Sequence, residues 1–551
     1  MGSASVERHP SEANRLRLRQ DLTSRRVPAA RTEQFNSATW LVDRHVDEGR
    51  SDRIAIRCQG RSTTYGELQQ QLWRAQHLLA ELGLSAGDRL AMVVQDDEVF
   101  PALFLGAQRS GIVAVPVSTM LNGTELASVI ADSGARALAI SHRFASAVPD
   151  IVAGAPNLES VVVDGDPATT TDAVGRSVDV RSWADATNVD EAATAETTKE
   201  SQAFWLYSSG TTGNPKGVIH LHGSLQATVT TYASEVLQVD PPDRFLSVAK
   251  LFFAFGLGNS LTFPFAVGAT AILNPDPLAP RLMAELIEAE SATLFFASPG
   301  FCAAMLDAGV EPSTFETVRA TVTAGESLPA NVHTRFTKLT NKAVLDGFGT
   351  TELLHIFISN TMNDQVPGTS GRVVTGYEAQ LRDDDGNIIS GPDSPGYLHV
   401  RGPSTAVGYW QRPEATEAAF RDGWVRTGDV YTCSNDDRWS FLGRNNDMIK
   451  AGGIWVSPAE VENVLSEHGS VLEAAVVGAR DAQGLETVVA FVLPASGSRI
   501  DLDELQQHCR SRMAAFKRPR RIEVVDELPK TATGKIKRFV LRDSVSDPVD
   551  L

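Results

Sequence analysis

The stretch Ser-Ser-Gly-Thr-Thr-Gly-Asn-Pro-Lys-Gly, residues 208–217, is the most informative part of this chain. It combines hydroxyl side chains, three glycines and one lysine within ten residues. Glycines let backbone N–H groups approach a phosphate closely, hydroxyls donate hydrogen bonds, and a lysine adds a mobile positive charge. Because the strand-like run 203–207 comes directly before it, the stretch predicts a nucleotide triphosphate clamp at the end of a strand. A Gly/Ser/Thr surface loop without a ligand is the alternative.

The order Lys216-Gly217 distinguishes the stretch from the P-loop of kinases and ATPases, in which Gly-Lys-Ser/Thr opens a helix. The stretch instead resembles the signature of the adenylate-forming superfamily of acyl-CoA synthetases, peptide-synthetase adenylation domains and luciferases. Four further segments follow in that family's order: Gly-Phe-Gly-Thr-Thr-Glu at 347–352, Thr-Gly-Asp at 427–429, Gly-Arg at 443–444 with Lys-Ala-Gly-Gly at 450–453, and Pro-Lys-Thr-Ala-Thr-Gly-Lys at 529–535. The five motifs together form a specific signature, and the resemblance covers roughly residues 35–543.

Composition limits the class of protein further. A chain of 551 residues is too long for a single hydrophobic core and is expected to form more than one domain. The formal net charge of −18 disfavours a general nucleic-acid binder, and any polyanionic substrate then needs a local basic patch. The four cysteines are far apart, without metal or redox spacing. With no apolar signal core at the N-terminus, they predict reduced thiols in a cytoplasmic protein.

One uncharged stretch has the length of a membrane span. Residues 251–273 carry no charged side chain over 23 residues. The stretch contains Gly256, Gly258, Pro264 and Gly268, and the sequence has no second run of this kind. We therefore predict a buried segment of a large domain, and no membrane partner.

Alternating strand-like and helix-like segments in the first 150 residues predict α/β layers with parallel sheet. Thr64 and Glu67 form a capping box before one helical segment. The predicted fold class is α/β: a large N-terminal domain of α/β layers with sheets, including a small β-rich subdomain after Gly371, and a small mobile α+β C-terminal domain. We expect a disordered tail over 1–34, the large adenylation domain with the ATP and acyl sites over 35–445, and the small C-terminal domain over 446–551.

The chemistry that the resemblance implies is activation of a carboxylate. Joining the carboxylate to the α-phosphate of ATP gives a mixed anhydride and pyrophosphate, and a thiol then displaces AMP. Both reactants of the first step are anions, and two unit charges about 4 Å apart repel by roughly 4 kcal/mol at an effective dielectric constant of about 20. Catalysis must therefore depend mainly on positioning and charge neutralisation. ATP and CoA are the implied co-substrates, and Mg²⁺ is the implied cofactor.

The resemblance assigns each matched motif a role in ATP binding. Thr351 matches the α-phosphate contact, and Glu352 matches the Mg²⁺ ligand, since one carboxylate with phosphates and waters suits this ion. Phe348 matches the position that stacks on adenine. Asp429 matches the carboxylate that receives the ribose hydroxyls, and Arg444 a further ribose contact, although Thr-Gly-Asp alone is a weak signal. The predicted phosphate clamp consists of Ser208, Ser209, Gly210, Thr211, Thr212, Gly213 and Lys216.

The first reaction is expected to depend most on Lys535. Its motif resembles that of a mobile lysine that bridges the carboxylate and the α-phosphate oxygens during adenylation. A point charge on a flexible stem can follow the charge as it develops. With Lys216, Thr351 and Glu352, Lys535 completes the predicted catalytic set. Without the resemblance, this lysine and its basic neighbours would be interpreted as a solvated face.

The resemblance also implies a second reaction, after rotation of the small domain about a hinge at Asn446. Asp or Lys is usual at this position, but Asn tolerates unusual backbone angles, so we expect rotation to be feasible. The basic residues of 517–521 suit the 3′-phosphate of CoA, and an unspecific basic turn is the alternative. The predicted CoA contacts are Gly452 and Gly453, which line the pantetheine tunnel, and Phe516, Arg518 and Arg520, which hold the nucleotide.

Within the superfamily the chain resembles benzoate–CoA ligases, in residues 249–259 and 353–357. Aromatic walls and bare glycine backbone predict a flat slot for one ring. His355 would share a helical face with Glu352 if that stretch is helical, and would touch the far edge of the ring; a packed, hydrogen-bonded histidine is the alternative. Phe255 stands where Tyr is expected, so the ring substituent stays open. The predicted acyl pocket consists of Ala254, Phe255, Phe295 or Phe296, Ala324, Gly325, Gly347, Gly349 and His355.

The sequence thus predicts an ATP-dependent, AMP-forming acid–thiol ligase for benzoate or a simple substituted benzoate. Alternatives are an enzyme that loads an aryl acid onto a carrier-protein pantetheine, or a CoA ligase for another small ring acid. A luciferase-like oxidation is disfavoured. A non-catalytic binding protein would be expected to lack Glu352 or Lys535. The expected partners are a small aromatic acid, ATP and CoA, with no nucleic acid, and the expected assembly is a monomer or homodimer.

Overall fold

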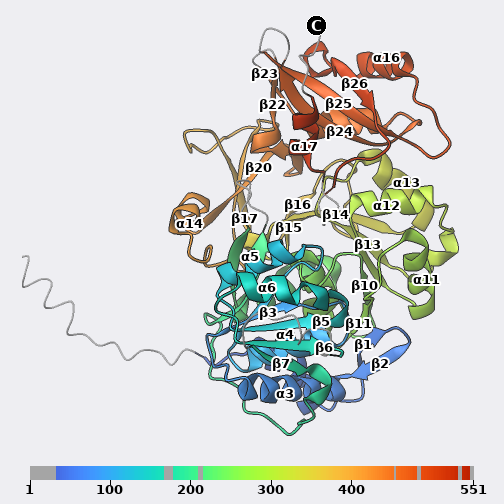
Figure 1. The fold of residues 1–551 in the computed structure, drawn as a ribbon. Helices are drawn as coiled ribbons and strands as arrows, with labels where there is room; N and C mark the ends of the chain where they lie inside the picture. The colour runs from blue at the N-terminus through green and yellow to red at the C-terminus, as the bar shows by residue number, and fades with distance from the viewer. Residues whose placement is uncertain are drawn as a thin grey trace, which may run out of the picture.

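The computed structural model describes residues 33–166, 178–208, 215–451, 454–480, 485–530 and 536–545. Sheets of seven, nine and five strands lie in the N-terminal part, and sheets of two and three strands lie in the C-terminal part. In Figure 1, β24, β25 and β26 lie at the opposite end of the molecule from β3, β5 and β6. The predicted α/β fold class is confirmed. Residues 1–32 of the predicted tail are outside the described part, and Gln34 forms a bridge with Thr198.

The seven-stranded sheet has the order β7-β6-β5-β3-β4-β8-β9. Its neighbouring strands are parallel except for the antiparallel pair β8 and β9. The strands are β3 (Arg89–Val93), β4 (Val113–Pro116), β5 (Ala137–Ser141), β6 (Ser160–Asp164), β7 (Asp179–Ser182), β8 (Gln202–Ser208) and β9 (Lys216–Leu221). The helices in this part of the sequence are α2 (Arg44–Asp47), α3 (Tyr65–Glu81), α4 (Val99–Arg109), α5 (Gly123–Ser133), α6 (Val148–Gly154) and α8 (His222–Thr228).

Helix α3 begins at the predicted capping box. The Thr64 side chain accepts a hydrogen bond from Glu67 N, and Glu67 Oε2 accepts one from Thr64 N at 2.7 Å. These bonds satisfy amide groups that the first turn of a helix leaves free. The apolar stripe of the helix is buried at Leu68, Leu72 and Leu79, so the 3.6-residue period of the sequence matches the packed face.

The nine-stranded sheet has the order β16-β15-β14-β13-β12-β10-β11-β1-β2. The central strands, β1 and β10 to β14, pair with one another in parallel. At the two edges of the sheet, β2, β15 and β16 pair antiparallel. The strands are β1 (Ile54–Cys58), β2 (Arg61–Thr64), β10 (Arg244–Ser247), β11 (Thr270–Leu273), β12 (Leu294–Ala297), β13 (Ala320–Thr323), β14 (Ala343–Gly349), β15 (Ile356–Ser359) and β16 (Arg372–Val373). The helices are α9 (Ala254–Leu257), α10 (Phe263–Val267), α11 (Pro280–Glu290), α12 (Pro299–Asp307) and α13 (Ala330–Thr340).

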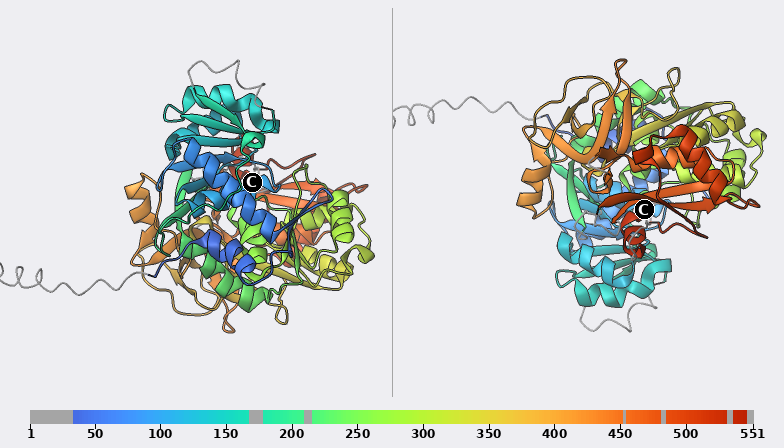
Figure 2. Two further views of the ribbon diagram at one scale, coloured as in Figure 1. Left: turned by 90° about the horizontal axis from the view of Figure 1, so that it is seen from below. Right: turned by 90° about the horizontal axis from the view of Figure 1, so that it is seen from above.

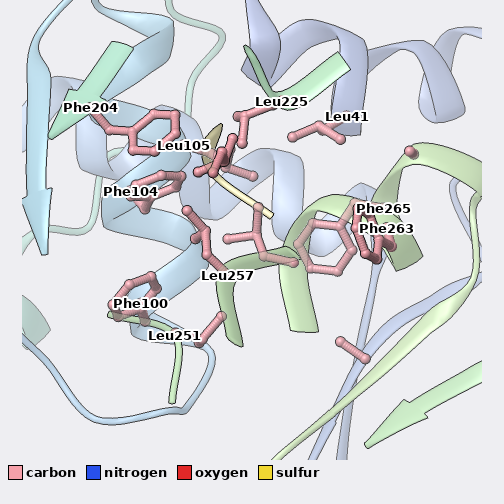
Figure 3. Packing of buried hydrophobic residues seen from close by; sticks show 14 of the residues in the cluster. Leu41, Phe100, Phe104, Leu105, Phe204, Leu225, Leu251, Leu257, Phe263 and Phe265 are labelled. Atoms are coloured by element: carbon pink, nitrogen blue, oxygen red, sulfur yellow. The ribbon is translucent and has the colours of Figure 1, made fainter. Parts of the chain in front are cut away.

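The uncharged stretch 251–273 is buried in the hydrophobic core, as predicted. It folds as short helical segments followed by β11. Leu251, Leu257, Phe263 and Phe265 are fully buried. In Figure 3 they lie among Phe100, Phe104 and Leu105 of α4 and Phe204 of β8, so side chains of both large sheets share one core. Among the helices of the described residues, none has the length and apolar character that a membrane crossing requires.

The β-rich subdomain predicted after Gly371 is an antiparallel sheet in the order β17-β18-β20-β19, with β21 paired to β20. Its antiparallel meander explains the short strands and turns of this part of the sequence. The elements are β17 (Glu378–Arg382), β18 (Gly396–Arg401), α14 (Pro413–Ala419), β19 (Phe420–Arg421), β20 (Trp424–Cys433) and β21 (Trp439–Arg444).

The C-terminal part combines a hairpin, a three-stranded sheet and helices. Viewed from above, its orange and red strands lie in front of the large sheets (Figure 2). Asn331 Nδ2 of α13 donates to Ser466 O, which joins the two parts. The elements are β22 (Ile449–Ala451), β23 (Ile454–Val456), α15 (Pro458–Ser466), β24 (Val471–Arg480), β25 (Glu486–Pro494), α16 (Leu502–Arg512), β26 (Arg521–Val524) and α17 (Arg538–Ser544).

Candidate active site

The predicted phosphate clamp spans the connection between β8 and β9. Ser208 is the last residue of β8, Lys216 is the first of β9, and the two are cross-strand partners. The motif therefore connects two antiparallel strands. The clamp residues that lie outside the described part are Ser209, Gly210, Thr211, Thr212 and Gly213.

The Thr-Thr-Glu motif forms one turn of 3₁₀-helix, Thr351–Leu353, just after β14. His220 of β9 lies beneath this turn, with its Nε2 atom 2.8 Å from Thr351 O. Burial lowers the pKa of His220 to about 4, so the ring is neutral at pH 7 and Nε2–H donates to the carbonyl. Strand β9 therefore carries Lys216 at its start and holds the Thr351 turn four residues later.

Tyr409 connects the predicted metal ligand with the predicted phosphate-binding lysine. Its hydroxyl donates to Glu352 Oε1 at 2.8 Å, and its ring centroid lies 5.1 Å from Lys216 Nζ. Burial, followed by the nearby Glu352 carboxylate, raises the pKa of Tyr409. Tyr409 is not among the residues predicted from the sequence, because it is 57 residues from Glu352 and only the folded chain brings the two together.

Asp429 and Arg444, the predicted ribose contacts, are cross-strand partners on β20 and β21. Arg444 Nε lies 3.0 Å from Asp429 Oδ1, and Arg444 Nη1 donates to Thr427 O at 3.2 Å. The Asp429 carboxylate is buried, whereas 43% of the Arg444 side chain is exposed. The antiparallel pairing explains why Thr-Gly-Asp and Gly-Arg occur as two separate motifs.

Phe348 lies where β14 meets the β-rich sheet. Its half-buried ring has three aromatic neighbours, with centroids 5.4 Å away for Phe357, 5.1 Å for Tyr431 and 6.4 Å for Phe441. Tyr431 and Phe441 belong to β20 and β21, which also carry the predicted ribose contacts. The predicted adenine and ribose residues are therefore supplied by adjoining elements.

His355 does not share a helical face with Glu352, so that expectation was wrong. The helical turn ends at Leu353, and Leu354 adopts a positive φ of 69° that redirects the chain into β15. The His355 ring is buried, with Nε2 3.1 Å from Asn259 Oδ1. Burial lowers the pKa of His355 to about 3, so the ring is neutral near pH 7. Its partner Asn259 is 96 residues away in the sequence and was not predicted.

Three of the predicted acyl-pocket side chains lie together. The ring of Phe255 is 5.5 Å from that of His355 and 6.1 Å from that of Phe296, measured between centroids. Of the Phe295/Phe296 pair, only Phe296 is in this group, whereas Phe295 packs into a different cluster with Phe315. Half-buried Ala254 precedes Phe255 at the start of α9.

The predicted pocket glycines differ in their surroundings. Gly325 has a φ of 94°, and a Cβ placed on it would meet no atom within 4 Å; Ala324 before it is buried. A Cβ on Gly347 would lie 2.7 Å from Ile356, and one on Gly349 would overlap His355 O. Gly325 thus borders open space, whereas Gly347 and Gly349 allow β15 to approach β14 closely.

The predicted CoA cluster is only partly available for a ligand. Lys517 forms an ion pair with Glu460, and Arg521 pairs with Glu523 at 2.7 Å. Arg518 donates to two backbone carbonyls, Met513 O at 2.9 Å and Arg510 O at 3.1 Å, and half-buried Phe516 packs on the C-terminal core. Arg520 is exposed. Gly452 and Gly453 lie outside the described residues.

Asn446, the predicted hinge, lies in a one-turn 3₁₀ segment, Asn445–Asp447, between β21 and β22. It is exposed, and its φ is not in the positive region. Arg542 of α17 donates to Asn446 O at 3.4 Å and pairs with Asp447 at 2.9 Å. The C-terminal helix therefore contacts the predicted hinge directly.

Lys535 lies outside the described residues, but the beginning of its motif approaches the large sheets. A Cβ placed on Gly300 would lie 3.9 Å from Lys530 Nζ and 3.5 Å from a carboxylate oxygen of Glu326. Glu326 directly follows Gly325, one of the predicted acyl-pocket residues. Lys530 also pairs with Glu473 of β24 at 2.8 Å.

This architecture defines an adenylate-forming enzyme. It combines two large α/β sheets, a β-rich sheet with Asp429 and Arg444, and a small C-terminal α+β part. The sequence matches the family described as AMP-binding enzyme over residues 42–410, and the AMP-binding enzyme C-terminal domain over residues 460–535. The chain therefore belongs to the AMP-binding enzyme family, as the motifs predicted.

Individual relatives are similar over nearly the whole chain. The sequence is 40% identical to a benzoate–CoA ligase of Thauera aromatica, over 93% of this chain and 96% of that one. It is 38% identical to a 4-hydroxybenzoate–CoA/benzoate–CoA ligase of Rhodopseudomonas palustris, over 92% and 94%. Among solved structures, an anthranilate CoA ligase in complex with anthranoyl-AMP superposes with a TM-score of 0.87 at 33% identity, covering 93% of this chain and 97% of that one. A benzoate CoA ligase from Burkholderia xenovorans has a TM-score of 0.82 at 37% identity, covering 92% and 100%.

Proposed function

We propose that this protein activates benzoate, or a simple substituted benzoate, to an aryl adenylate and transfers the aryl group to CoA. The observation that carries the proposal is the group of Phe255, Phe296 and neutral His355, in which His355 follows Glu352 by three residues in the sequence. Such a surface suits a flat apolar ring whose carboxylate points toward the nucleotide. The similarity to aryl-CoA ligases over more than nine-tenths of the chain supports the same reaction class.

In this proposal the first half-reaction depends on charge placed around the ATP phosphates. Lys216 and the residues 208–213 bind the β- and γ-phosphates, and Thr351 contacts the α-phosphate. Asp429 and Arg444 bind the ribose, and Phe348 stacks on adenine. Lys535 bridges the acid and the α-phosphate and thereby stabilises the charge that develops between them.

Glu352 would hold Mg²⁺, which neutralises phosphate charge. No cluster of three His, Cys, Asp or Glu side chains that could hold a metal occurs in the part of the chain that the structure describes. A single half-buried carboxylate near Lys216 nevertheless fits this ion, because Mg²⁺ commonly uses one or two carboxylates together with substrate phosphates and water.

The second half-reaction follows rotation at Asn446, so that residues 35–445 and 446–551 act as two domains. Gly452 and Gly453 would admit the pantetheine, while Phe516, Arg518 and Arg520 would hold the nucleotide of CoA. Because the neighbouring cations Lys517 and Arg521 have ion-pair partners within the chain, a carrier-protein pantetheine is the second candidate for the acceptor. We further propose that the assembly is a monomer or a homodimer. The four free cysteines support a reducing compartment such as the cytoplasm.

A panel of acids, assayed for AMP release with and without CoA, tests this function. We expect benzoate and small substituted benzoates to give CoA-dependent AMP release with formation of the aryl-CoA thioester. Aliphatic acids of similar size should be poor substrates. Acid-dependent pyrophosphate release that CoA does not stimulate would favour the carrier-protein alternative, and no response to any aryl acid would contradict the proposal.

A further inference from the structure

A segment of the β-rich part, residues 404–410, surrounds the turn that carries Glu352. Ser404 Oγ donates to Leu353 O at 2.7 Å, and Ala406 N donates to Glu352 O at 2.8 Å. The Tyr409 hydroxyl donates to Glu352 Oε1 at 2.8 Å. One segment therefore holds the backbone of this turn and orients its carboxylate.

The same segment pairs with β9, the strand that begins at Lys216. Val407 N donates to Ile219 O and Ile219 N donates to Gly408 O, both at 3.0 Å, and Trp410 N donates to Gly217 O at 2.8 Å. This pairing fixes the Tyr409 backbone, and its ring then lies 5.1 Å from Lys216 Nζ. Tyr409 thus contacts two groups of opposite charge through two different parts of its side chain.

The two parts of the tyrosine have separable effects. A hydroxyl that donates to one carboxylate oxygen restricts rotation of the carboxylate and leaves its other oxygen for a cation. An aromatic face attracts an ammonium group and limits the positions that a flexible lysine adopts.

We propose that Tyr409 is a positioning residue for the bound ATP: its hydroxyl orients the Glu352 carboxylate toward Mg²⁺, and its ring holds Lys216 for the phosphates. This inference rests on the proposed function, in which Glu352 is the metal ligand and Lys216 a phosphate contact. It assigns to the segment 404–410 a role that none of the five sequence motifs contains.

The test measures ATP binding to the full chain by calorimetry, without acid or CoA, as the Mg²⁺ concentration is varied. Tyr409→Phe removes only the hydroxyl. The measured quantity is the Mg²⁺ concentration at which half of the metal-dependent gain in ATP affinity is reached. We expect Tyr409→Phe to raise this concentration about 10-fold, the usual scale for losing a partner of a metal-binding side chain. ATP affinity without Mg²⁺ should not change, because the ring remains beside Lys216.

Tyr409→Leu removes the hydroxyl and the ring. We expect the same shift in Mg²⁺ dependence and, in addition, ATP binding about threefold weaker without Mg²⁺, the scale of one exposed cation–π contact. The matched control is Tyr397→Phe, which removes a hydroxyl of β18 that donates to Asp384 Oδ1 at 2.6 Å in the β-rich sheet. The control should leave both quantities unchanged.

A double-mutant cycle separates this inference from the proposed function. In a Glu352→Ala background, Tyr409→Phe should have no further effect on Mg²⁺ dependence. The role of Tyr409 would be overturned by an unchanged Mg²⁺ dependence in Tyr409→Phe, or by a shift that persists in the Glu352→Ala background. In either case a changed Mg²⁺ dependence in Glu352→Ala alone would still support Glu352 as the metal ligand. An unchanged Mg²⁺ dependence in Glu352→Ala would overturn the metal assignment and this inference with it.

Discussion

At the scale of single residues, we expect ring recognition to depend on His355 and Phe255. His355 is held neutral by burial and contacts Asn259 through Nε2. Phe255 is an apolar wall that offers no hydrogen-bond partner. A ring hydroxyl buried against such a wall would be unpaired, at a cost of about 1–3 kcal/mol. The slot should therefore discriminate among substituted benzoates by the position of their polar groups.

We expect benzoate to be preferred over any hydroxybenzoate whose hydroxyl points at Phe255. Phe255→Tyr should shift preference toward a ring that can pair with the new hydroxyl, and His355→Ala should relax discrimination at the far edge. The measurement is kcat/KM for benzoate and its hydroxy, amino and fluoro derivatives. A ranking that changes by less than about threefold, roughly 0.65 kcal/mol, in both variants would remove these residues from the acyl pocket.

The buried His220 predicts a specific pH dependence. Its pKa is about 4 in the folded protein, below the usual 6.5, so between these values the unfolded chain binds a proton that the native protein does not. The contribution of His220 to the free energy of unfolding is therefore complete above pH 6.5 and declines as the pH falls toward 4, by up to roughly 1.4 kcal/mol per pH unit.

His220→Gln should remove this pH dependence while keeping a donor for Thr351 O. We expect the difference in Tm between wild type and variant to move against the wild type as the pH is lowered from 7 to 5. Thermal unfolding at several pH values checks this, with His77→Gln on the exposed face of α3 as the control. A difference that stays constant with pH would show that His220 is not buried in the neutral form.

At the scale of elements, β14 and β15 form the part of the site that the sequence predicted least well. The motif in residues 347–352 was recognised from its letters, but the backbone path after it depends on Leu354, whose positive φ is rare for a branched side chain. No local pattern indicates such a residue. The two carbonyls before Leu354, Leu353 O and Glu352 O, accept hydrogen bonds from Ser404 and Ala406, which are distant in sequence.

Gly349→Ala tests the close approach of β15 to β14. The added methyl group would overlap His355 O, so the strands must separate or His355 must move. We expect a loss of about 1–3 kcal/mol in stability, typical of overpacking, with a weaker preference among ring acids. Thermal unfolding and the acid panel measure the two effects. Gly469→Ala, where a Cβ would meet no atom within 4 Å, is the matched control and should be close to neutral.

A separate prediction concerns the segment 517–521 and the binding of CoA. Arg520→Ala should raise the KM for CoA by about tenfold, the scale of one hydrogen bond to a charged group, and leave ATP–pyrophosphate exchange unchanged. Arg521→Ala should have a smaller effect on this KM, because Arg521 is already paired with Glu523. If neither variant alters the KM for CoA, the nucleotide of CoA binds elsewhere.

At the scale of the whole molecule, the sequence predicted what depends on local patterns. Short-range periodicity and composition were enough to predict three features: the strand before residue 208, the capping box at Thr64, and the burial of residues 251–273. The sequence did not show which distant elements meet. The contact of Tyr409 with Glu352 and the ion pair of Lys517 with Glu460 required the tertiary structure, because the partners are 57 residues apart in each case.

In the proposed mechanism, the two half-reactions take place in two different arrangements of the chain. A mutation should therefore be able to abolish one half-reaction and leave the other intact. Lys535 should serve the first and be dispensable for the second, since rotation of the C-terminal part would remove it from the site. Loss of a preorganised charge donor costs at least about 100-fold in rate. The folded state of the variant can be checked by its Tm against the wild type.

The most direct measurement compares wild type and Lys535→Ala in benzoate-dependent ATP–pyrophosphate exchange without CoA, and in thioester formation from supplied benzoyl-AMP and CoA. We predict that the wild type performs both reactions, and that Lys535→Ala loses the exchange by at least about 100-fold while it still forms benzoyl-CoA. Absence of benzoate-dependent exchange in the wild type would contradict an aryl-CoA ligase, and an equal loss of both half-reactions in a folded variant would contradict the two-arrangement mechanism.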